Sequence, residues 1–374
     1  MQNYQINTEK NTWNAIGVMS GTSVDGLDIV AASFSYKDRW EYNLIKTDSI
    51  DYPEELRQRL LDCINASAQE LVYLDLDLGL FMAHRITEFL KDTKISIDLV
   101  ASHGHTVFHQ PENGMTKQIG DGQTILQKTG ILTINDFRTM DVLNGGQGAP
   151  LVPMGDQYLF PKYDICLNIG GFANISFNDP AGNRIAFDTG PANLLLNYLS
   201  RKTGRQYDPN GETARKGKLI DKLYNDFNNL PYYTQKPPKS LGLEWVKDSI
   251  FEVLDNADNK IPDLLNTCTR HISFHINKAI RNEFQDTQNP NAVIKVLVTG
   301  GGAHNRFLMD CLKIDGKGIN YILPSREIID YKEALIFAFL GILRYLGKEN
   351  ILRSATGAKI DSVGGTVHNN IISQ

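Results

Sequence analysis

Several kinds of segment are absent from this chain of 374 residues, and each absence excludes a class of protein. The four cysteines lie far apart with no CxxC pair, which argues against a disulfide framework and favours reduced thiols. The longest apolar run, Ala334–Leu343, is too short to span a bilayer. The first residues, MQNYQINTEKNTW, lack a basic segment followed by an apolar one, so we expect neither export nor membrane insertion, and a cytoplasmic protein.

Charge of one sign is not concentrated anywhere in the chain. The formal net charge is -5, and Lys and Arg are scattered rather than clustered, so the sequence shows no footprint for nucleic acid or for an anionic membrane. A small molecule is the expected partner. No GxxxxGK(S/T) motif occurs, which excludes a P-loop, and no GxGxxG motif follows a predicted strand, which argues against a dinucleotide fold.

What the chain does contain is an alternation of short apolar runs and helical stretches. Hydrophobic residues make up 41% of it, and its length is that of two domains. The alternation predicts an α/β fold with buried sheets. Strands are expected at 15–19, 27–34, 99–102, 118–120, 132–135, 165–169, 173–177, 185–187 and 293–299, and helices from 53 to 90 and at 192–202, 212–228, 243–254, 264–284 and 333–346. Residues 231–238 are expected to form a surface loop.

Two segments suggest where the domains divide. The glycine-rich segment Asp136–Pro150 has little helical or strand propensity and is predicted to be a hinge. The helix at 333–346 is apolar almost all round, so we expect it to be packed on every side and to return the chain to the first domain. The predicted domains are residues 1–137 with 341–374, and residues 138–340.

The most informative motif is GVMSGTSVDGLD, residues 17–28, which places small and hydroxylated residues after an apolar strand. Backbone N–H groups approach a polyphosphate closely only where side chains are small, and hydroxyls add donors. A carboxylate there can hold hydrated Mg²⁺, with Asp25 as the nearest candidate. A plain β-hairpin also favours Gly and Asp, so the motif alone leaves both readings open. The candidate nucleotide-binding residues are Ser20, Gly21, Thr22, Ser23, Asp25, Gly26 and Asp28.

Two further glycine turns each follow an apolar strand. LNIGGFANIS contains Gly170 and Gly171, and the strand at 293–299 ends in Gly300, Gly301 and Gly302. Three such turns fit the actin-like ATPase (ribonuclease H-like) plan, in which two related α/β domains face a nucleotide cleft and each offers one hairpin to the phosphates. The third turn is then the expected adenosine site.

The chain resembles the anhydro-N-acetylmuramic acid kinase family along its whole length, in the sequences of several motifs. The motifs that carry the resemblance are GVMSGTSVDGLDI, ASHGHTVFHQP, QIGDG, NDFRTMDVLNGGQGAPLVP, LNIGGFANIS, FDTGPAN, YDPNGETARKG, VTGGGAHN and KEALIFAFLG. The resemblance implies an enzyme of peptidoglycan recycling. It would use ATP, Mg²⁺ and water to convert 1,6-anhydro-N-acetylmuramic acid into N-acetylmuramic acid 6-phosphate, and it would form a homodimer.

The resemblance also assigns roles to single residues. Asp188, in FDTGPAN, matches the catalytic aspartate that takes a proton from the attacking water. Arg138, in DFR, matches a sugar-contacting arginine, and Thr106 and Glu333 are further sugar contacts. The chain departs from the family where it has Leu241 and Leu243 in place of polar and basic residues, so side-chain contacts from that loop are in doubt.

Each assignment has a structural alternative. Asp188 could cap the helix that opens near Pro191, and Arg138 could pair with Asp136 or Asp141 to fix the hinge. His103, His105 and His109, or the pair His271 and His275, could bind a metal, although hydrogen bonding is the commoner role and no HExxH motif is present. At the level of the whole protein, the alternatives are a non-catalytic ATP-binding scaffold and a simple hydrolase that needs no ATP.

Overall fold

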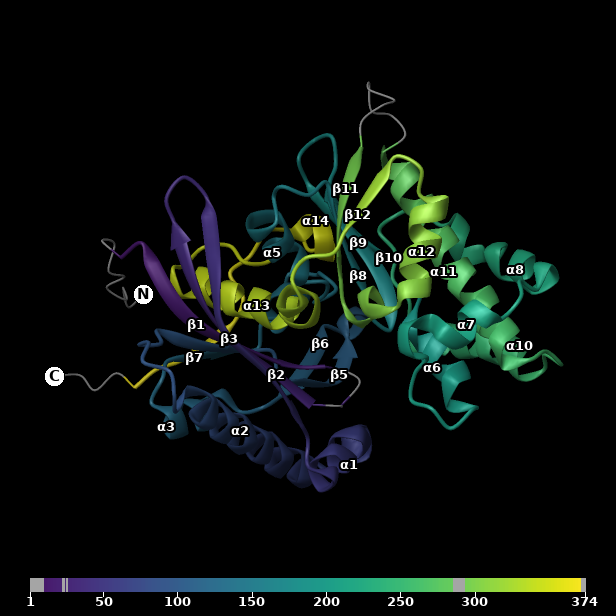
Figure 1. The fold of residues 1–374 in the computed structure, drawn as a ribbon. Helices are drawn as coiled ribbons and strands as arrows, with labels where there is room; N and C mark the ends of the chain where they lie inside the picture. Colours follow the sequence, from purple (N-terminus) through teal and green to yellow (C-terminus); the bar gives the residue numbers. More distant parts are fainter. Residues whose placement is uncertain (1–9, 22–23, 25, 285–292, 371–374) are drawn as a thin grey trace. The chain divides into compact units, whose positions relative to one another are not determined.

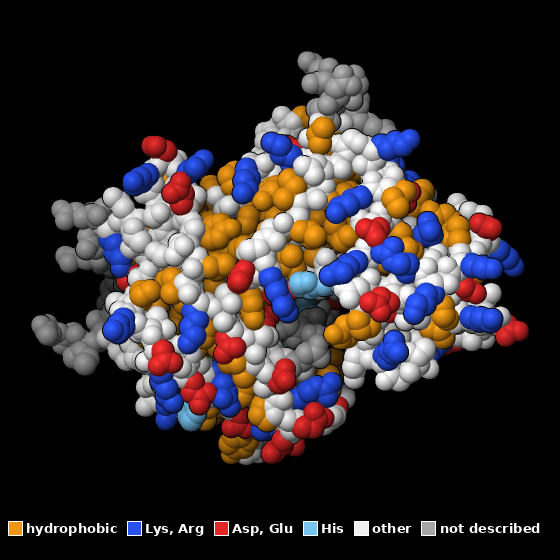
Figure 2. Space-filling model, viewed as in Figure 1, with side chains coloured by type: hydrophobic (Ala, Val, Ile, Leu, Met, Phe, Trp, Pro, Cys, Tyr) orange, Lys and Arg blue, Asp and Glu red, His pale blue; other side chains and the backbone are white. Residues whose placement is uncertain are grey.

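A computed structural model describes residues 10–21, 24, 26–284 and 293–370. The chain divides into two compact units (Figure 1). The first comprises the residues up to Phe160 and those from Tyr331 onward, and the second comprises Pro161–Asp330. No helix of the described residues is both long and apolar enough to cross a membrane. On the face seen in Figure 2, acidic and basic side chains are interspersed rather than gathered into a patch of one sign.

The first unit is built on a six-stranded sheet of order β13-β7-β4-β1-β2-β3. Strands β1, β2 and β3 form an antiparallel meander, and β4 and β7 run parallel to β1. The strands are β1 (Thr12–Ser20), β2 (Gly26–Tyr36), β3 (Trp40–Asp51), β4 (Leu99–Ser102), β7 (Thr133–Asn135) and β13 (Thr366–His368), with a separate hairpin of β5 (His105–Gln110) and β6 (Met115–Ile119). The helices are α1 (Glu54–Asp62), α2 (Ala68–Leu90), α3 (Gly122–Thr129), α4 (Thr139–Leu143), α5 (Val152–Leu159), α13 (Arg326–Tyr345) and α14 (Arg353–Thr356).

Helices cover both faces of this sheet because side chains alternate along β1. Ile16 and Val18 pack with Leu78 and Met82 of α2 in one core cluster. Gly17, between them, faces α13 so closely that a Cβ atom there would lie 1.8 Å from the carbonyl oxygen of Ala334. Figure 1 shows α2 along one face and α13 along the other.

The second unit has a five-stranded sheet of order β10-β9-β8-β11-β12. Strands β8, β9 and β10 form an antiparallel meander, and β11 and β12 continue the sheet in parallel. The strands are β8 (Ile165–Ile169), β9 (Phe172–Asn178), β10 (Arg184–Pro191), β11 (Ile294–Thr299) and β12 (Ile319–Ile322). The helices are α6 (Asn193–Arg201), α7 (Glu212–Lys216), α8 (Asp221–Asn228), α9 (Leu243–Val246), α10 (Glu252–Asp255), α11 (Ile261–Phe284) and α12 (Arg306–Asp315), with a large core between sheet and helices.

The two sheets share one topology. If the strands of each main sheet are numbered along the chain, both sheets begin with a three-stranded meander. Both then add their next two strands in parallel beside the first strand, which gives the order 3-2-1-4-5. The first sheet adds β13 at its far edge. This repetition confirms the predicted duplicated α/β architecture of the actin-like ATPase, ribonuclease H-like class.

The compact units divide at other residues than the sequence suggested. The expected boundaries followed residues 137 and 340, whereas the units change after Phe160 and Asp330. The segment after Phe137 stays with the first unit because its polar groups are bound there. Asp141 is fully buried and accepts a hydrogen bond of 2.7 Å from Thr356 Oγ1, and Lys332 Nζ lies 3.0 Å from the Asp156 carboxylate. The predicted hinge also contains a short helix, α4.

Candidate functional site

In the second unit, Asp188 is held on β10 by three hydrogen bonds to the segment that follows α8. Its N–H donates to the carbonyl of Lys239 at 3.2 Å, and its own carbonyl accepts from Tyr232 Oη at 2.7 Å. The carboxylate Oδ2 accepts from the backbone N–H of Leu241 at 2.9 Å. The side chain therefore has a fixed direction, and the doubt raised by leucine at position 241 does not touch this contact, because the backbone makes it.

The protonation of Asp188 is set by burial. Burial raises its pKa from 3.8 to about 6, and the Leu241 N–H, which stabilises the charged form, opposes part of that rise. A carboxylate with this pKa is ionised at neutral pH but close to its titration, which suits a general base. The helix-capping alternative is wrong: the residue before α6 is Ala192, and no side chain caps that helix.

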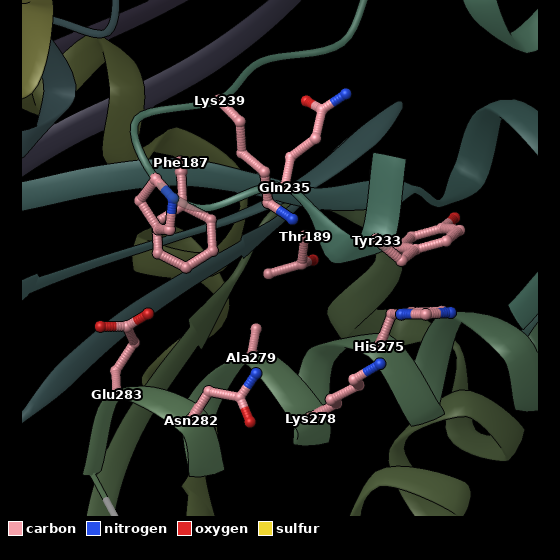
Figure 3. A pocket seen from close by; sticks show the side chains of 11 residues that line it. Phe187, Thr189, Tyr233, Gln235, Lys239, His275, Lys278, Ala279, Asn282 and Glu283 are labelled. Carbon is pink, nitrogen blue, oxygen red and sulfur yellow. The ribbon is translucent and has the colours of Figure 1, made fainter. Parts of the chain in front are cut away.

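A polar pocket lies behind β10 (Figure 3). Phe187 and Thr189, the neighbours of Asp188, line it together with residues of the 233–239 segment and of α11. Since neighbouring strand residues point to opposite faces, Asp188 faces away from this pocket and does not line it. Burial and the charge of Lys278 lower the pKa of Lys239, and burial raises that of Glu283.

The two glycine turns of the second unit meet at one edge of its sheet. A Cβ atom on Gly302 would lie 2.2 Å from Ile169 Cγ2, so the third turn packs on the end of β8. Asn193, at the start of α6, donates from its side chain to the Ile169 carbonyl at 3.2 Å. Its backbone N–H donates to the Gly170 carbonyl at 3.1 Å. The carboxyl ends of β8 and β11 and the first turn of α6 thus converge, as in other α/β ligand sites.

These glycines differ in what requires them. Gly300 has a φ of +82°, and it and Gly302 are crowded, so the fold itself explains both. Gly171 has no described atom within 4 Å of an added Cβ, and the nearest atom to one on Gly301 is 3.7 Å away. Packing of the described chain does not require glycine at these two positions. Gly301 also lines an open pocket, together with Asn193, Asn197, Tyr207, Asp208, His304 and Arg326 among others.

In the first unit, the turn between β1 and β2 carries the other predicted nucleotide residues. Ser20 is buried and accepts a hydrogen bond of 2.7 Å from Tyr52 Oη, and Asp28 accepts one of 2.6 Å from Ser49 Oγ. Gly21 accepts from the Val24 N–H at 3.2 Å, and Gly26 packs on the backbone of β3. The remaining predicted residues, Thr22, Ser23 and Asp25 with its suggested magnesium role, lie outside the described residues.

The three predicted sugar contacts of the first unit form one cluster. Arg138 donates to His103 Nε2 from Nε at 3.1 Å and from Nη2 at 2.8 Å, and it donates from Nη1 to the Gly148 carbonyl at 2.7 Å. Thr106 is linked to the same histidine by Gln118, whose Nε2 lies 3.2 Å from Thr106 Oγ1 and 3.0 Å from His103 Nε2.

Glu333 completes this cluster through its charge. Burial raises its pKa, the positive charges of Lys332 and Arg138 oppose that rise, and the negative charge of Asp28 adds to it. These interactions place the carboxyl group within electrostatic reach of both Arg138 and the hairpin residue Asp28. Arg138 is itself partly buried: burial lowers its pKa to about 10, the negative charges of Glu333 and Asp141 oppose that change, and the side chain stays charged at neutral pH.

Arg138 makes no described hydrogen bond to Asp136 or Asp141, although the charge of Asp141 favours its charged form. The carboxylate of Asp136 accepts from Thr139, and that of Asp141 accepts from Gly148 and Thr356, while the hydrogen bonds of Arg138 go to His103 and Gly148.

Four of the five histidines considered as metal ligands have ring nitrogens in side-chain or backbone hydrogen bonds, whereas Nδ1 of His105 is buried without a hydrogen-bond partner among the described residues. Besides His103, His109 bonds to Thr116 Oγ1 at 3.1 Å, and Asn228 Oδ1 accepts from both His271 and His275. Burial lowers the pKa of His271 to about 3 and that of His275 to about 2, so this pair stays neutral. Within the described part of the chain, no group of three or more His, Cys, Asp or Glu side chains is arranged to hold a metal ion.

Sequence reasoning missed four residues of these networks. His103 was considered only as a possible metal ligand, and Tyr232, Lys239 and Gln118 were given no role. The signals were their places within or beside recognised motifs and segments: His103 in SHGH, Gln118 at the start of QIGDG, Tyr232 in the segment predicted to be a surface loop, and Lys239 directly after it. Tyr232 is buried and contacts Asp188, so that segment is not simply a surface loop.

Comparisons with known proteins agree over nearly the whole chain. The model of the family "Anhydro-N-acetylmuramic acid kinase" matches residues 13–370. A protein of that name from Acinetobacter baylyi is 34% identical, with 94% of this chain and 98% of that protein covered. Another protein of that name, from Photobacterium profundum, is 35% identical, with 92% of this chain and 95% of that protein covered. Among solved structures, component A of (R)-2-hydroxyglutaryl-CoA dehydratase from Acidaminococcus fermentans matches with a TM-score of 0.44 and 13% sequence identity. The match covers 87% of this chain and 96% of that one. This likeness is too distant to bear on function. The chain belongs to the anhydro-N-acetylmuramic acid kinase family.

Proposed function

We propose that this chain is an ATP-dependent kinase of cell-wall recycling. It adds water to the anomeric carbon of 1,6-anhydro-N-acetylmuramic acid, which opens the 1,6-bridge, and it transfers the γ-phosphoryl group of ATP to the released O6. The products are N-acetylmuramic acid 6-phosphate and ADP. The observation that carries the proposal is the partly buried carboxylate of Asp188, which a backbone N–H holds and whose pKa is raised to about 6, because water addition to a sugar needs such a base.

Asp188 would take a proton from the attacking water as positive charge builds on the sugar ring. Its Oδ2 is already engaged by the Leu241 N–H, so Oδ1 is the oxygen that we assign to the water. The Leu241 N–H restrains the carboxylate, while the backbone of Asp188 is held because its N–H donates to Lys239 and its carbonyl accepts from Tyr232 Oη. Holding the base in one orientation lowers the entropic part of the barrier.

The nucleotide would be bound by the glycine turns of both units. Gly171 and Gly301 support this part of the proposal, because their open surroundings leave room for a ligand against the backbone. Ser20, Gly21 and Asp28 belong to the corresponding hairpin of the first unit. Bound Mg²⁺ would neutralise charge on the phosphates. It keeps several waters and needs only one or two carboxylates, a demand that Asp28 and the predicted ligand Asp25 fit without a larger cluster.

The sugar would be bound by Arg138, Thr106 and Glu333. A guanidinium offers paired N–H donors that match a carboxylate such as the lactyl group, and Glu333 offers oxygens that accept from sugar hydroxyls. The shared network through His103 and Gln118 supports a single binding surface for these residues in the first unit.

Mass spectrometry in oxygen-18 water tests the reaction. We expect a product that carries one labelled oxygen in the sugar and one unlabelled phosphoryl group, formed only when ATP and Mg²⁺ are present. A scaffold that only binds ATP would form no sugar product, and a simple hydrolase would release labelled sugar without phosphate and without ATP. The Asp188→Asn variant, which keeps the shape but removes the base, should bind ATP and form no product.

We further propose a cytoplasmic homodimer. A surface that could contact a second copy is the exposed apolar face of α2, where Val72, Leu76 and Leu80 follow one another at helical spacing and are 60%, 41% and 36% exposed. Light scattering of the purified protein tests this, and Leu76→Glu should then give monomers.

A further inference from the structure

We propose that His103 is a positioning residue. It acts as a neutral hydrogen-bond acceptor that turns the guanidinium of Arg138 so that one pair of N–H donors is left for an anionic ligand. This inference rests on the sugar-binding role given to Arg138 above. It concerns a residue that never needs to touch the sugar.

Arg138 has more N–H donors than its described hydrogen bonds use. A guanidinium has five N–H bonds in one plane, and an acceptor shared by Nε and Nη2 must lie on the edge between those two nitrogens. His103 Nε2 occupies that edge, at 3.1 and 2.8 Å. The Gly148 carbonyl takes a bond from Nη1 at 2.7 Å. One N–H on Nη1 and one on Nη2 are not used by these bonds, and we assign them to an anionic ligand, because a carboxylate accepts from such donors in pairs.

The tautomer of His103 follows from its other nitrogen. Nδ1 lies 2.9 Å from the carbonyl of Gly104, which can only accept, so Nδ1 carries the proton. Nε2 is then a lone-pair acceptor, as Arg138 requires, since its Nε and Nη2 can only donate. A proton on Nε2 would face these donors and break the arrangement.

The surroundings of the ring keep it in this state. It packs against Phe337 with 4.6 Å between ring centroids, and it is 2% exposed. Burial and the positive charge of Arg138 hold the pKa of His103 well below its usual value, with His105 adding to the effect and backbone carbonyls opposing it. The histidine therefore remains an acceptor through the pH range in which other histidines titrate.

His103 Nε2 also helps to orient Thr106, through the side chain of Gln118. The Gln118 side-chain nitrogen lies between His103 Nε2 and Thr106 Oγ1, so turning the imidazole would disturb both predicted sugar contacts at once. Thr106 and Gln118 face each other across the β5–β6 hairpin, which keeps the linkage short. His103 thus organises a surface that offers the remaining N–H donors of Arg138 and the hydroxyl hydrogen of Thr106.

Steady-state kinetics with a double-mutant cycle tests the role. His103→Phe keeps an aromatic ring without the acceptor, and we expect the KM for the anhydro sugar to rise about 10- to 100-fold, as expected for loss of a bond to a charged group, while the KM for ATP stays unchanged. In an Arg138→Ala background the same substitution should add nothing. His103→Gln, whose Oε1 can replace the acceptor, should recover part of the loss. His368→Phe is the matched control and should behave as the parent, because His368 lies on β13 at the far edge of the sheet, where it is bonded to Asn135.

Nitrogen-15 NMR of labelled histidine tests the geometry without relying on any reaction. We expect an Nε2 signal typical of an unprotonated, hydrogen-bonded nitrogen at neutral pH and through the range in which exposed histidines titrate, and a shift of that signal in Arg138→Ala. A protonated Nε2 at neutral pH, or independent and additive effects of the two substitutions on KM, would overturn the inference. Absence of turnover by the parent enzyme would instead count against the proposed reaction, and the NMR result would still decide the role of His103.

Discussion

Asp188→Asn should remove activity and at the same time stabilise the fold. In the folded chain the carboxyl pKa is raised from 3.8 to about 6, so ionising it costs more in the folded than in the unfolded state. A shift of about two units corresponds to about 3 kcal/mol at 1.36 kcal/mol per unit, and because the group is not fully buried we expect about 2 kcal/mol. Asparagine never ionises, and its side-chain oxygen still accepts from the Leu241 N–H.

The pH dependence of this gain has a definite sign. Because the folded pKa is the higher one, the parent loses stability as pH rises from about 3.8 to about 6. The advantage of the variant is therefore complete at pH 7 and absent below pH about 4. Thermal unfolding at the two pH values measures it, and a gain of about 2 kcal/mol raises Tm by about 4–8 °C for a unit of this size. A variant less stable than the parent at neutral pH, or a difference that is the same at both pH values, would refute the reasoning.

Three more outcomes follow from the structure. The kcat of the parent should fall about tenfold per pH unit below about 6 as Asp188 takes up its proton, and a profile flat to pH 5 would remove it as the base. Gly171→Ala should leave the unfolding temperature unchanged, because nothing lies within 4 Å of the added methyl, yet weaken a non-hydrolysable ATP analogue about tenfold in calorimetry. Equal ATP affinity would show that the nucleotide does not approach that backbone. Gly17→Ala should destabilise the protein by about 3 kcal/mol or more in denaturant unfolding, since its methyl would lie 1.8 Å from the Ala334 carbonyl oxygen, and a stable variant would show that β1 and α13 are not so tightly packed.

Much of the fold was predictable because its apolar pattern is local. The strands expected at 15–19, 27–34 and 165–169 appear within β1, β2 and β8, since short apolar runs bounded by glycine turns have few other solutions. Strand β3, Trp40–Asp51, was not predicted, because it is polar along much of its length and only its pairing with β2 makes it a strand. The single helix expected at 212–228 is two, α7 and α8. They are separated at Gly217, where a Cβ would lie 1.9 Å from the Pro262 carbonyl oxygen.

The candidate site was predictable only where motifs name it. Asp188 and Arg138 lie in recognisable sequence motifs. Their partners, Leu241 and His103, are 53 and 35 residues away in the sequence and contact them through tertiary packing. No local pattern indicates that Lys239 and Leu241 meet β10 through main-chain groups, because the backbone is the same in every sequence. The orientation of a catalytic side chain is thus the part of a site that sequence alone leaves open.

The contact between Leu241 and Asp188 has an evolutionary consequence. Because the donor is a main-chain amide, any amino acid except proline supplies it, and drift at this position leaves the carboxylate in place. We therefore expect the amino acid at position 241 to vary among natural sequences, even though it contacts a group on which turnover depends. The side chain at position 241 can therefore be substituted in engineered variants, provided that the backbone conformation of the loop is kept and proline is avoided.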